Sequence, residues 1–182
     1  MNANLSPEHK PDGYPLELEQ WVALADGRRV FVRPVVVDDA PAVDAALAAA
    51  DSETVYQRFF RTPVRLNAST LDRLTRLDYQ QRLALAAFDV DGQGAAIARY
   101  ESTEPGVAEV AIVVDPAWRN AGLGSLLLEE LELAATQRGI ERFTAIYLPS
   151  NLAIERLLVR RGFAVRLPDD AVAAAEKWLT AA

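Results

Sequence analysis

The sequence lacks cysteine altogether and contains a single histidine, His9, in the polar N-terminal segment. Without these side chains the chain cannot form a thiol nucleophile, a thiolate zinc site or a Ser-His-Asp triad. We therefore expect no bound metal. Any catalytic chemistry must come from carboxylates, hydroxyls, tyrosine, arginine and backbone groups.

Positive charge and long apolar runs are also scarce. The 26 acidic residues outnumber the 19 basic ones, which gives a net charge of −7. An acidic domain repels a phosphate backbone, so nucleic acid is not an expected partner. No run approaches the roughly 18 apolar residues of a membrane-spanning helix, and MNANLSPEHKPDG lacks the apolar core of a signal peptide. We expect a cytoplasmic protein with no membrane partner.

The length of the chain, 182 residues, is enough for one domain with a full core. Residues 1–15 are polar and contain three prolines, so we expect a flexible tail there. No internal repeat or low-complexity linker divides the remainder. We therefore predict a single α/β domain over residues 16–182, and the sequence leaves its oligomeric state open.

Strand-like segments occupy two parts of the chain. LELEQWVAL and RRVFVRPV flank Asp26-Gly27, a two-residue turn signal, and this pattern predicts a β-hairpin. LALAAFDV, AAIARYES and VAEVAIVVD are separated by the turn sequences DGQG and TEPG, which predicts a meander. RFTAIYL predicts one further strand near the C-terminal third of the chain.

Helical spacing of apolar residues predicts the other elements. Before the meander, one helix follows Asp38 or Asp39, a short second helix includes residues 55–60, and a third opens at Ser69. The aromatic side chains of the second helix could line an acceptor groove or pack in the core; they are Tyr56, Phe59 and Phe60.

Two amphipathic helices follow the meander, and each is expected to end at a glycine. The first begins near residue 123 and stops at Gly139, and the second is NLAIERLLVRR, which stops at Gly162. Asp169 or Asp170 can cap a last helix that carries Val172, Ala175 and Leu179 on one face.

Two glycines lie where the last strand of the meander gives way to a helix, in DPAWRNAGLGSLLLEELELAATQRG. Free N–H groups at a helix start attract anions, and glycine lets a phosphate approach the backbone. The sequence contains no GxxxxGK[ST], and a GxGxxG motif would need glycine at Leu127. Gly122 and Gly124 either cradle a diphosphate in this loop or only form a tight turn and a close helix–strand contact.

The order strand, (R/Q)xxGxG, amphipathic helix, strand, Asn-started helix and GF resembles the GNAT superfamily of acyl-CoA N-acyltransferases. AIVVDPAWRNAGLGSLL and IERFTAIYLPSNLAIERLLVRRGF carry this resemblance over about residues 107–165. Upstream, DGRRVFVRPVVVDDA, SETVYQRFF and RLTRLDYQQRLALAAF are similar to the acetyltransferase domain of Pat-type bacterial protein lysine acetyltransferases. The resemblance implies a central, mostly antiparallel, twisted sheet that splays after its fourth strand, with helices on both faces.

The resemblance also implies acetyl-CoA as donor and partner, and it assigns the binding residues. The fourth strand, Val107 to Val114, would hold the pantetheine arm through Ile112, Val113 and Val114. The following loop would hold the pyrophosphate through Arg119, Asn120, Ala121, Gly122, Leu123, Gly124 and Ser125. Asn151 would reach the cofactor near the next helix start, although a plain helix cap explains it equally well.

The acceptor amine must lose a proton before it attacks a thioester. A lysine amine has a pKa of about 10.4, so deprotonation at pH 7 costs about 4.6 kcal/mol. Glu109 interrupts the apolar run VAEVAIVV and matches the proposed catalytic base of the Pat-type enzymes. Alternation along the strand also allows Glu109 to face solvent on the side opposite Val110 and Ile112. Glu101 and Glu104, on the preceding strand and its turn, are the alternative carboxylates.

Two positions depart from the wider superfamily. Leu158 stands where many members carry a tyrosine that protonates the leaving thiolate, and Ala121 stands where arginine or lysine is frequent. The function expected is direct transfer of an acetyl group to a primary amine, with a protein lysine favoured. A small-molecule amine acetyltransferase, an N-terminal acetyltransferase and a non-catalytic CoA-binding regulatory module are the alternatives.

Overall fold

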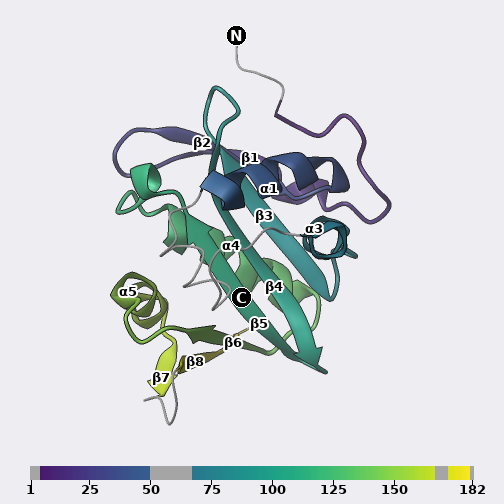
Figure 1. Ribbon diagram of the computed structural model, residues 1–182. Coiled ribbons are helices and arrows are strands. Elements are labelled where there is room, and N and C mark those ends of the chain that lie inside the picture. Colours follow the sequence, from purple (N-terminus) through teal and green to yellow (C-terminus); the bar gives the residue numbers. More distant parts are fainter. Residues whose placement is uncertain (1–4, 50–66, 167–171, 181–182) are drawn as a thin grey trace.

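Figure 1 presents a computed structural model of the protein, which describes residues 5–49, 67–166 and 172–180. Eight strands form one sheet in the order β1-β2-β3-β4-β5-β6-β8-β7. Every neighbouring pair is antiparallel except β5 and β6, which are parallel. The strands are β1 (Gln20–Ala23), β2 (Arg29–Pro34), β3 (Arg82–Phe88), β4 (Gly94–Glu104), β5 (Val107–Val114), β6 (Arg142–Tyr147), β7 (Ala164–Arg166) and β8 (Ala173–Trp178).

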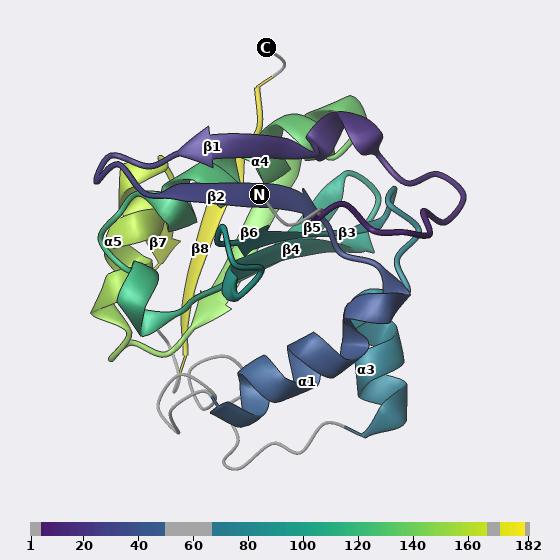
Figure 2. The same cartoon turned by 90° about the horizontal axis from the view of Figure 1, so that it is seen from above.

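Helices cover both faces of this sheet, as expected. The described α-helices are α1 (Ala40–Ala49), α3 (Ala68–Thr75), α4 (Leu123–Gln137) and α5 (Leu152–Arg160). Figure 2 shows α1 and α3 together on one side of the sheet, with α4 on the other. Short 3-10 turns occupy Leu16–Leu18, Val37–Asp39 and Pro116–Trp118.

The main core lies between the sheet and α4. Leu127, Leu128 and Leu131 of α4 are fully buried against inward-facing residues of β3, β4 and β5, and Leu157 and Leu158 of α5 join the same cluster. A smaller apolar cluster on the opposite face joins Val35, Ala84 and Ala86, with Leu77 packed against it. The strands bury side chains on both faces, which explains the nearly continuous apolar run of β3.

The hairpin, the meander and the two glycine-terminated helices are confirmed. Strands β1 and β2 pair across the turn at Asp26-Gly27, and β5 occupies Val107–Val114 as predicted. Because the sheet has one more strand upstream than the resemblance implies, the strand that the resemblance counts as fourth is β5 here. Gly139 and Gly162 have φ of +78° and +82° directly after α4 and α5, the left-handed conformation that ends a helix.

The prediction of a C-terminal helix is wrong, because this segment forms β8. Residues Ala173 to Trp178 pair antiparallel with both β6 and β7 and fill the gap between them. Ala173 and Ala175 are buried while Ala174 is exposed, a period of two. The alanine-rich sequence has high helix propensity, but the ladder hydrogen bonds on both edges outweigh it.

Two smaller expectations also change. Asn67, rather than Ser69, caps α3, because its Oδ1 accepts a hydrogen bond of 2.8 Å from the backbone N–H of Thr70. Asp39 lies in the 3-10 turn before α1, where its carboxylate accepts a hydrogen bond from the backbone N–H of Val36. The short helix expected over residues 55–60 lies outside the described residues.

The N-terminal segment contacts the domain from residue 5 onward. The carbonyl of Leu5 accepts a hydrogen bond of 2.8 Å from Nε of Arg33. Glu19 accepts hydrogen bonds from the hydroxyls of Ser6 and Tyr14, and the Tyr14 ring packs edge-on against Tyr79. These contacts hold the segment against β2 and the core.

Candidate active site

A groove of about 700 Å³ opens where β5 and β6 part. The two strands pair only at Val107, Ala108 and Glu109 of β5, which face residues 142–144 of β6. Beyond Glu109 the strands diverge, so β6 supplies no ladder partner for the backbone of β5 from Val110 to Val114. The groove is walled by these two strands, the loop before α4, and both α4 and α5.

The structure brings nearly all of the predicted site residues to this groove. Ala121 is the exception, because its side chain is buried in the core. The predicted residues that line the groove are Glu109, Ile112, Val113, Val114, Arg119, Asn120, Gly122, Leu123, Gly124, Ser125 and Asn151.

The loop before α4 owes its shape to two left-handed residues. Asn120 has φ of +63° and Gly122 has φ of +86°. Gly122 is the N-cap of α4, and no side chain caps this end of the helix. The N–H groups of the first turn, Leu123 to Ser125, therefore have no partner within the helix and lie at the groove, with the positive end of the helix dipole.

The two glycines have different structural roles. A Cβ on Gly122 would meet no atom within 4 Å, so glycine is needed there for its backbone conformation alone. A Cβ on Gly124 would lie 3.1 Å from Cδ2 of Leu157 and 3.5 Å from Cδ1 of Ile112. Gly124 thus allows α4 to approach α5 and β5 closely, which is the packing role considered from the sequence. Neither role prevents their N–H groups from facing an anion.

Asn151 is the N-cap of α5. Its Oδ1 accepts a hydrogen bond of 3.1 Å from the backbone N–H of Ile154, and the residue also lines the groove. Of the nearby arginines, Arg160 lines the groove, whereas Arg161 is paired with Glu129 and Glu132. The cap explains the position of Asn151 without any ligand.

Glu109 lies at the closed end of the groove, where the pairing of β5 with β6 stops. It is half-buried, and its neighbours Ala108 and Val110 are buried on the opposite face of the sheet. Among the described residues, no hydrogen bond or ion pair engages its carboxylate. The carboxylate is therefore placed to accept a proton from a group in the groove.

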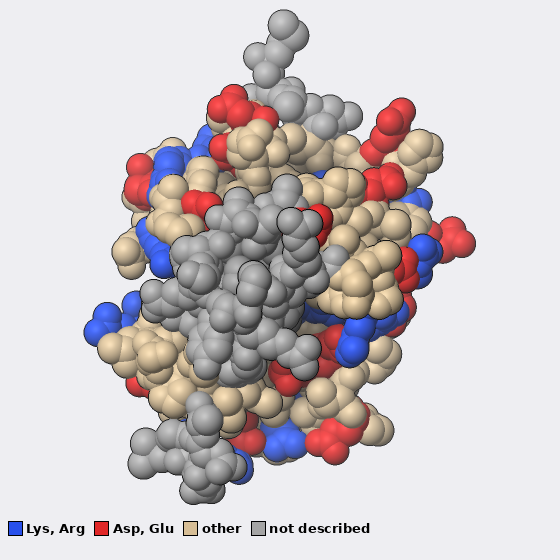
Figure 3. Space-filling view, in the orientation of Figure 1, with Lys and Arg blue, Asp and Glu red and all other residues tan. Residues whose placement is uncertain are grey.

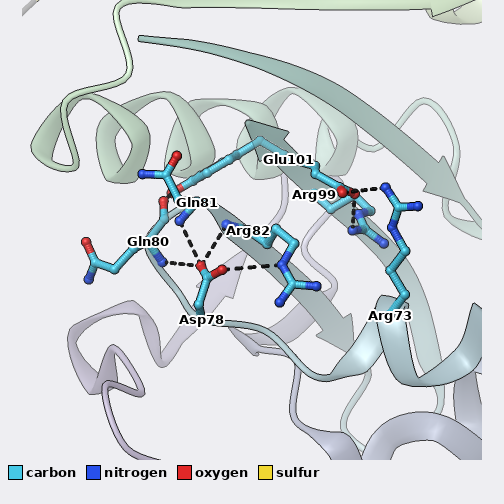
Figure 4. Close-up of polar contacts among 8 residues, drawn as sticks. Arg73, Asp78, Gln80, Gln81, Arg82, Arg99 and Glu101 are labelled. Carbon is cyan, nitrogen blue, oxygen red and sulfur yellow. Dashed lines mark hydrogen bonds and ion pairs between the residues drawn. The ribbon is translucent and has the colours of Figure 1, made fainter. Parts of the chain in front are cut away.

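Glu101, a second carboxylate, stands directly opposite Glu109 on β4. Figure 4 shows that Arg73 and Arg99 hold it, with N–O distances of 2.5 and 3.0 Å. Glu101 does not line the groove. Of this pair, Glu109 is the carboxylate that faces the groove, and Glu101 is engaged in ion pairs.

Tyr147 at the end of β6 is a groove residue that the sequence interpretation missed. Its side chain is buried, and its hydroxyl donates a hydrogen bond of 3.4 Å to Glu155. Burial, followed by the nearby Glu155 carboxylate, raises the pKa of Tyr147, so its hydroxyl is protonated at neutral pH. Leu158 also lines the groove but offers no proton. The only signal for Tyr147 is its place in the alternation of RFTAIYL.

The chain is similar in sequence to a family of known proteins. Residues 51–163 match the Acetyltransferase (GNAT) family, which is more than half of the chain. The chain belongs to this family. It is a GNAT acetyltransferase, and the family uses acetyl-CoA.

Two curated relatives and one solved structure resemble this GNAT protein over most of its length. It is 29% identical over 161 residues to acetyltransferase PA5475 of Pseudomonas aeruginosa, covering 85% of this chain and 87% of the relative. It is 30% identical to acetyltransferase Pat of Mycolicibacterium smegmatis over 78% of this chain, but spans only 43% of that relative. The GNAT domain of S. lividans PAT superposes with a TM-score of 0.85 at 34% identity, over 91% of this chain and 99% of that domain.

Two observations concern all of the described residues rather than the groove alone. None of their helices combines the length and the apolar character that crossing a bilayer requires. Within the same ranges, no three side chains of the kinds that ligate metals come together. Figure 3 shows acidic and basic side chains interspersed over the visible face.

Proposed function

We propose that this GNAT acetyltransferase takes acetyl-CoA as donor and transfers the acetyl group directly to the side-chain amine of a protein lysine. One observation carries the proposal: the groove is lined at one end by the Glu109 carboxylate and at the other by the N–H groups that begin α4. A thioester joined to a phosphate group by a long arm fits such a groove. Its reactive end would lie near the Glu109 carboxylate, and its phosphates would lie near the N–H groups that begin α4.

The donor would lie along the unpaired part of β5. Amide and carbonyl groups of the pantetheine arm can bond the backbone of Ile112, Val113 and Val114 as a further strand would. The pyrophosphate would accept hydrogen bonds from backbone N–H groups between Arg119 and Ser125. Because position 121 is alanine, where arginine or lysine is frequent in the superfamily, the loop offers one charge fewer and would bind the pyrophosphate mainly through backbone N–H groups.

Glu109 would act as general base for the acceptor. The carboxylate removes a proton from the ammonium, directly or through water, and the neutral amine attacks the thioester carbonyl. The C–N bond forms, the C–S bond breaks and the CoA thiolate leaves, while the nitrogen gives up its second proton to water or to the departing thiolate. A backbone N–H of β5 would stabilise the oxyanion of the tetrahedral intermediate. The chain contains no cysteine, so no thioester with the enzyme can intervene.

The similarity to Pat-type proteins supports a protein lysine as the acceptor. The chain is similar to the acetyltransferase Pat and to the GNAT domain of S. lividans PAT, at 30% and 34% identity. The Pat-like segments noted in the sequence precede β5 in the chain and add to this support. We therefore place a lysine side chain, rather than a free small amine, against Glu109.

The test is acetylation of a mixed set of proteins, read as acetyl-lysine by mass spectrometry. We expect Glu109→Gln to keep acetyl-CoA binding in calorimetry and to lower turnover at least about tenfold. Glu104→Gln is the matched control, because this carboxylate is exposed, pairs with Arg142 and does not line the groove. A no-enzyme reaction measures spontaneous acetylation.

Each contrary outcome rules out a different part of the proposal. Unchanged turnover in Glu109→Gln removes Glu109 from the mechanism. If only small amines or protein N-termini are acetylated, the proposed lysine acceptor is wrong. Binding of acetyl-CoA without turnover indicates a regulatory CoA-binding module, and an absence of binding at millimolar acetyl-CoA rejects the donor itself.

A further inference from the structure

The tip of the β1–β2 hairpin contacts the turn that precedes the glycine loop. Arg28, immediately before β2, donates a hydrogen bond of 2.9 Å from Nη1 to the carbonyl of Ala117. Its guanidinium lies over the Trp118 ring, 4.2 Å from the centroid. Trp118 in turn lines the groove and packs against the main core. In Figure 1 the hairpin tip and this turn lie next to each other.

The guanidinium of Arg28 is fixed from its other side by Asp26. Nε and Nη2 of Arg28 lie 2.8 and 2.7 Å from Oδ2 of Asp26, and the backbone N–H of Arg28 bonds Oδ1. These hydrogen bonds from Arg28 lower the pKa of Asp26. The guanidinium of Arg28 is therefore held in place without any ligand, with Nη1 directed at the carbonyl of Ala117.

We propose that Arg28 is a positioning residue for the donor: it holds the turn Pro116–Trp118, and through it the loop Arg119–Gly124, in the shape that receives the nucleotide end of acetyl-CoA. This inference rests on the proposed use of the groove by acetyl-CoA. Arg28 acts through Trp118 and Ala117 and needs no contact with the donor.

Apart from Trp118, which packs against the main core, the turn is held by local hydrogen bonds. It spans only three residues, and Asp115 satisfies its start by accepting a hydrogen bond from the backbone N–H of Ala117. The carbonyl of Pro116 accepts a hydrogen bond from the backbone N–H of Arg119, whereas no backbone N–H of the described residues reaches the carbonyl of Ala117. A cation beside such a carbonyl at a helix end is favourable. Arg28 supplies this partner to Ala117 and covers one face of the indole. A planar fork is required for both contacts, so lysine cannot replace arginine here.

Arg29 on the same hairpin provides a matched control. Its guanidinium also stacks on a tryptophan, Trp21, with 5.0 Å to the ring centroid. Trp21 does not line the groove. Arg28→Ala and Arg29→Ala therefore remove the same charge and the same kind of stacking, one at the loop and one away from it.

Steady-state kinetics provide the first test. We expect Arg28→Ala to raise KM for acetyl-CoA about five- to tenfold and to leave kcat within about twofold. Arg28→Lys should behave like Arg28→Ala, Trp118→Ala should show a similar rise, and the double variant should be no worse than either single one. Arg29→Ala should retain the KM of the unaltered protein.

Amide hydrogen exchange in the free protein provides a second test that does not depend on acetyl-CoA. Exchange over residues 116–122 should accelerate in Arg28→Ala and not in Arg29→Ala. Unchanged exchange overturns the inference even if acetyl-CoA is the donor. If exchange accelerates but the protein does not bind acetyl-CoA, Arg28 still holds the turn, and the proposed donor is wrong instead.

A direct contact between Arg28 and the 3′-phosphate of CoA is the remaining possibility. In that case the KM defect of Arg28→Ala would disappear with acetyl-dephospho-CoA as donor, while that of Trp118→Ala would persist. Rescue by Arg28→Lys would likewise indicate a simple charge effect. Either result overturns the positioning role.

Discussion

At position 122 the backbone has φ of +86°, in the left-handed region that residues with a Cβ avoid. The residue is the N-cap of α4 and borders the groove. A side chain there would project into open space, so the constraint lies in the backbone and not in packing. Asn120, two residues earlier, is also left-handed, in agreement with the tolerance of asparagine for this region.

This geometry predicts a graded effect of substitution. We expect Gly122→Ala to lower the free energy of unfolding by about 1 kcal/mol, and Gly122→Asn to lower it by about half as much. Urea unfolding of the three proteins measures both changes. Equal stability of the glycine and alanine proteins would contradict the backbone argument.

At the scale of elements, a single carboxylate on α4 joins α5 and β8 to the core. Oε2 of Glu132 lies 2.6 Å from Nη2 of Arg161 and 2.8 Å from Nζ of Lys177. Glu132 is only 12% exposed, so these ion pairs are largely withdrawn from solvent. They fix the C-terminal end of α5, whose other end borders the groove.

Loss of this carboxylate should destabilise the fold. We expect Glu132→Ala to lower the free energy of unfolding by about 2 kcal/mol, because Lys177 loses its carboxylate partner while largely buried and Arg161 keeps only the exposed Glu129. Arg76→Ala, which breaks the exposed pair with Asp72, should change it by less than about 0.5 kcal/mol. Denaturant unfolding measures the loss of stability in both variants. Equal losses would show that burial of the ion pair does not set its contribution to stability.

At the scale of the molecule, buried tyrosine hydroxyls connect the core to its edges. The hydroxyl of Tyr79 donates to the carbonyl of Val35, and that of Tyr100 donates to the carbonyl of Gln80. Burial raises the pKa of each of these tyrosines to about 12. Both groups therefore hold their protons more tightly in the folded protein than in the unfolded chain, where the pKa is about 10.

The sign of the resulting pH dependence follows from this difference. Above about pH 10 the unfolded chain binds fewer protons than the folded protein, so the free energy of unfolding falls as pH rises. Each tyrosine contributes up to about 1.4 kcal/mol per pH unit between about pH 10 and 12. Urea unfolding at pH 8 to 11 should show this loss, and Tyr100→Phe should reduce the slope. A flat profile would contradict the raised pKa values.

Much of the site was predictable because its signals are local. The apolar run VAEVAIVVD predicted the strand β5, the resemblance gave its observed bounds, and Gly122 marked the loop conformation before α4. The position of Glu109 in that strand followed from the same pattern. Its role as base stays a prediction.

Other features depend on residues that are distant in the chain. The alanine-rich end of the chain forms β8 only because β6 and β7 leave a space between them. Tyr147 enters the groove only because β6 diverges from β5, and Arg28 meets Trp118 only because the hairpin folds over the turn.

The sequence by itself therefore determined the order of most elements and the glycine loop of this GNAT acetyltransferase, since backbone conformation and apolar periodicity are properties of short segments. The tertiary structure decided which of two carboxylates faces the groove, what the last segment forms and what holds the loop in place. Those outcomes depend on hydrogen bonds, ion pairs and burial between segments that the chain brings together only when it folds.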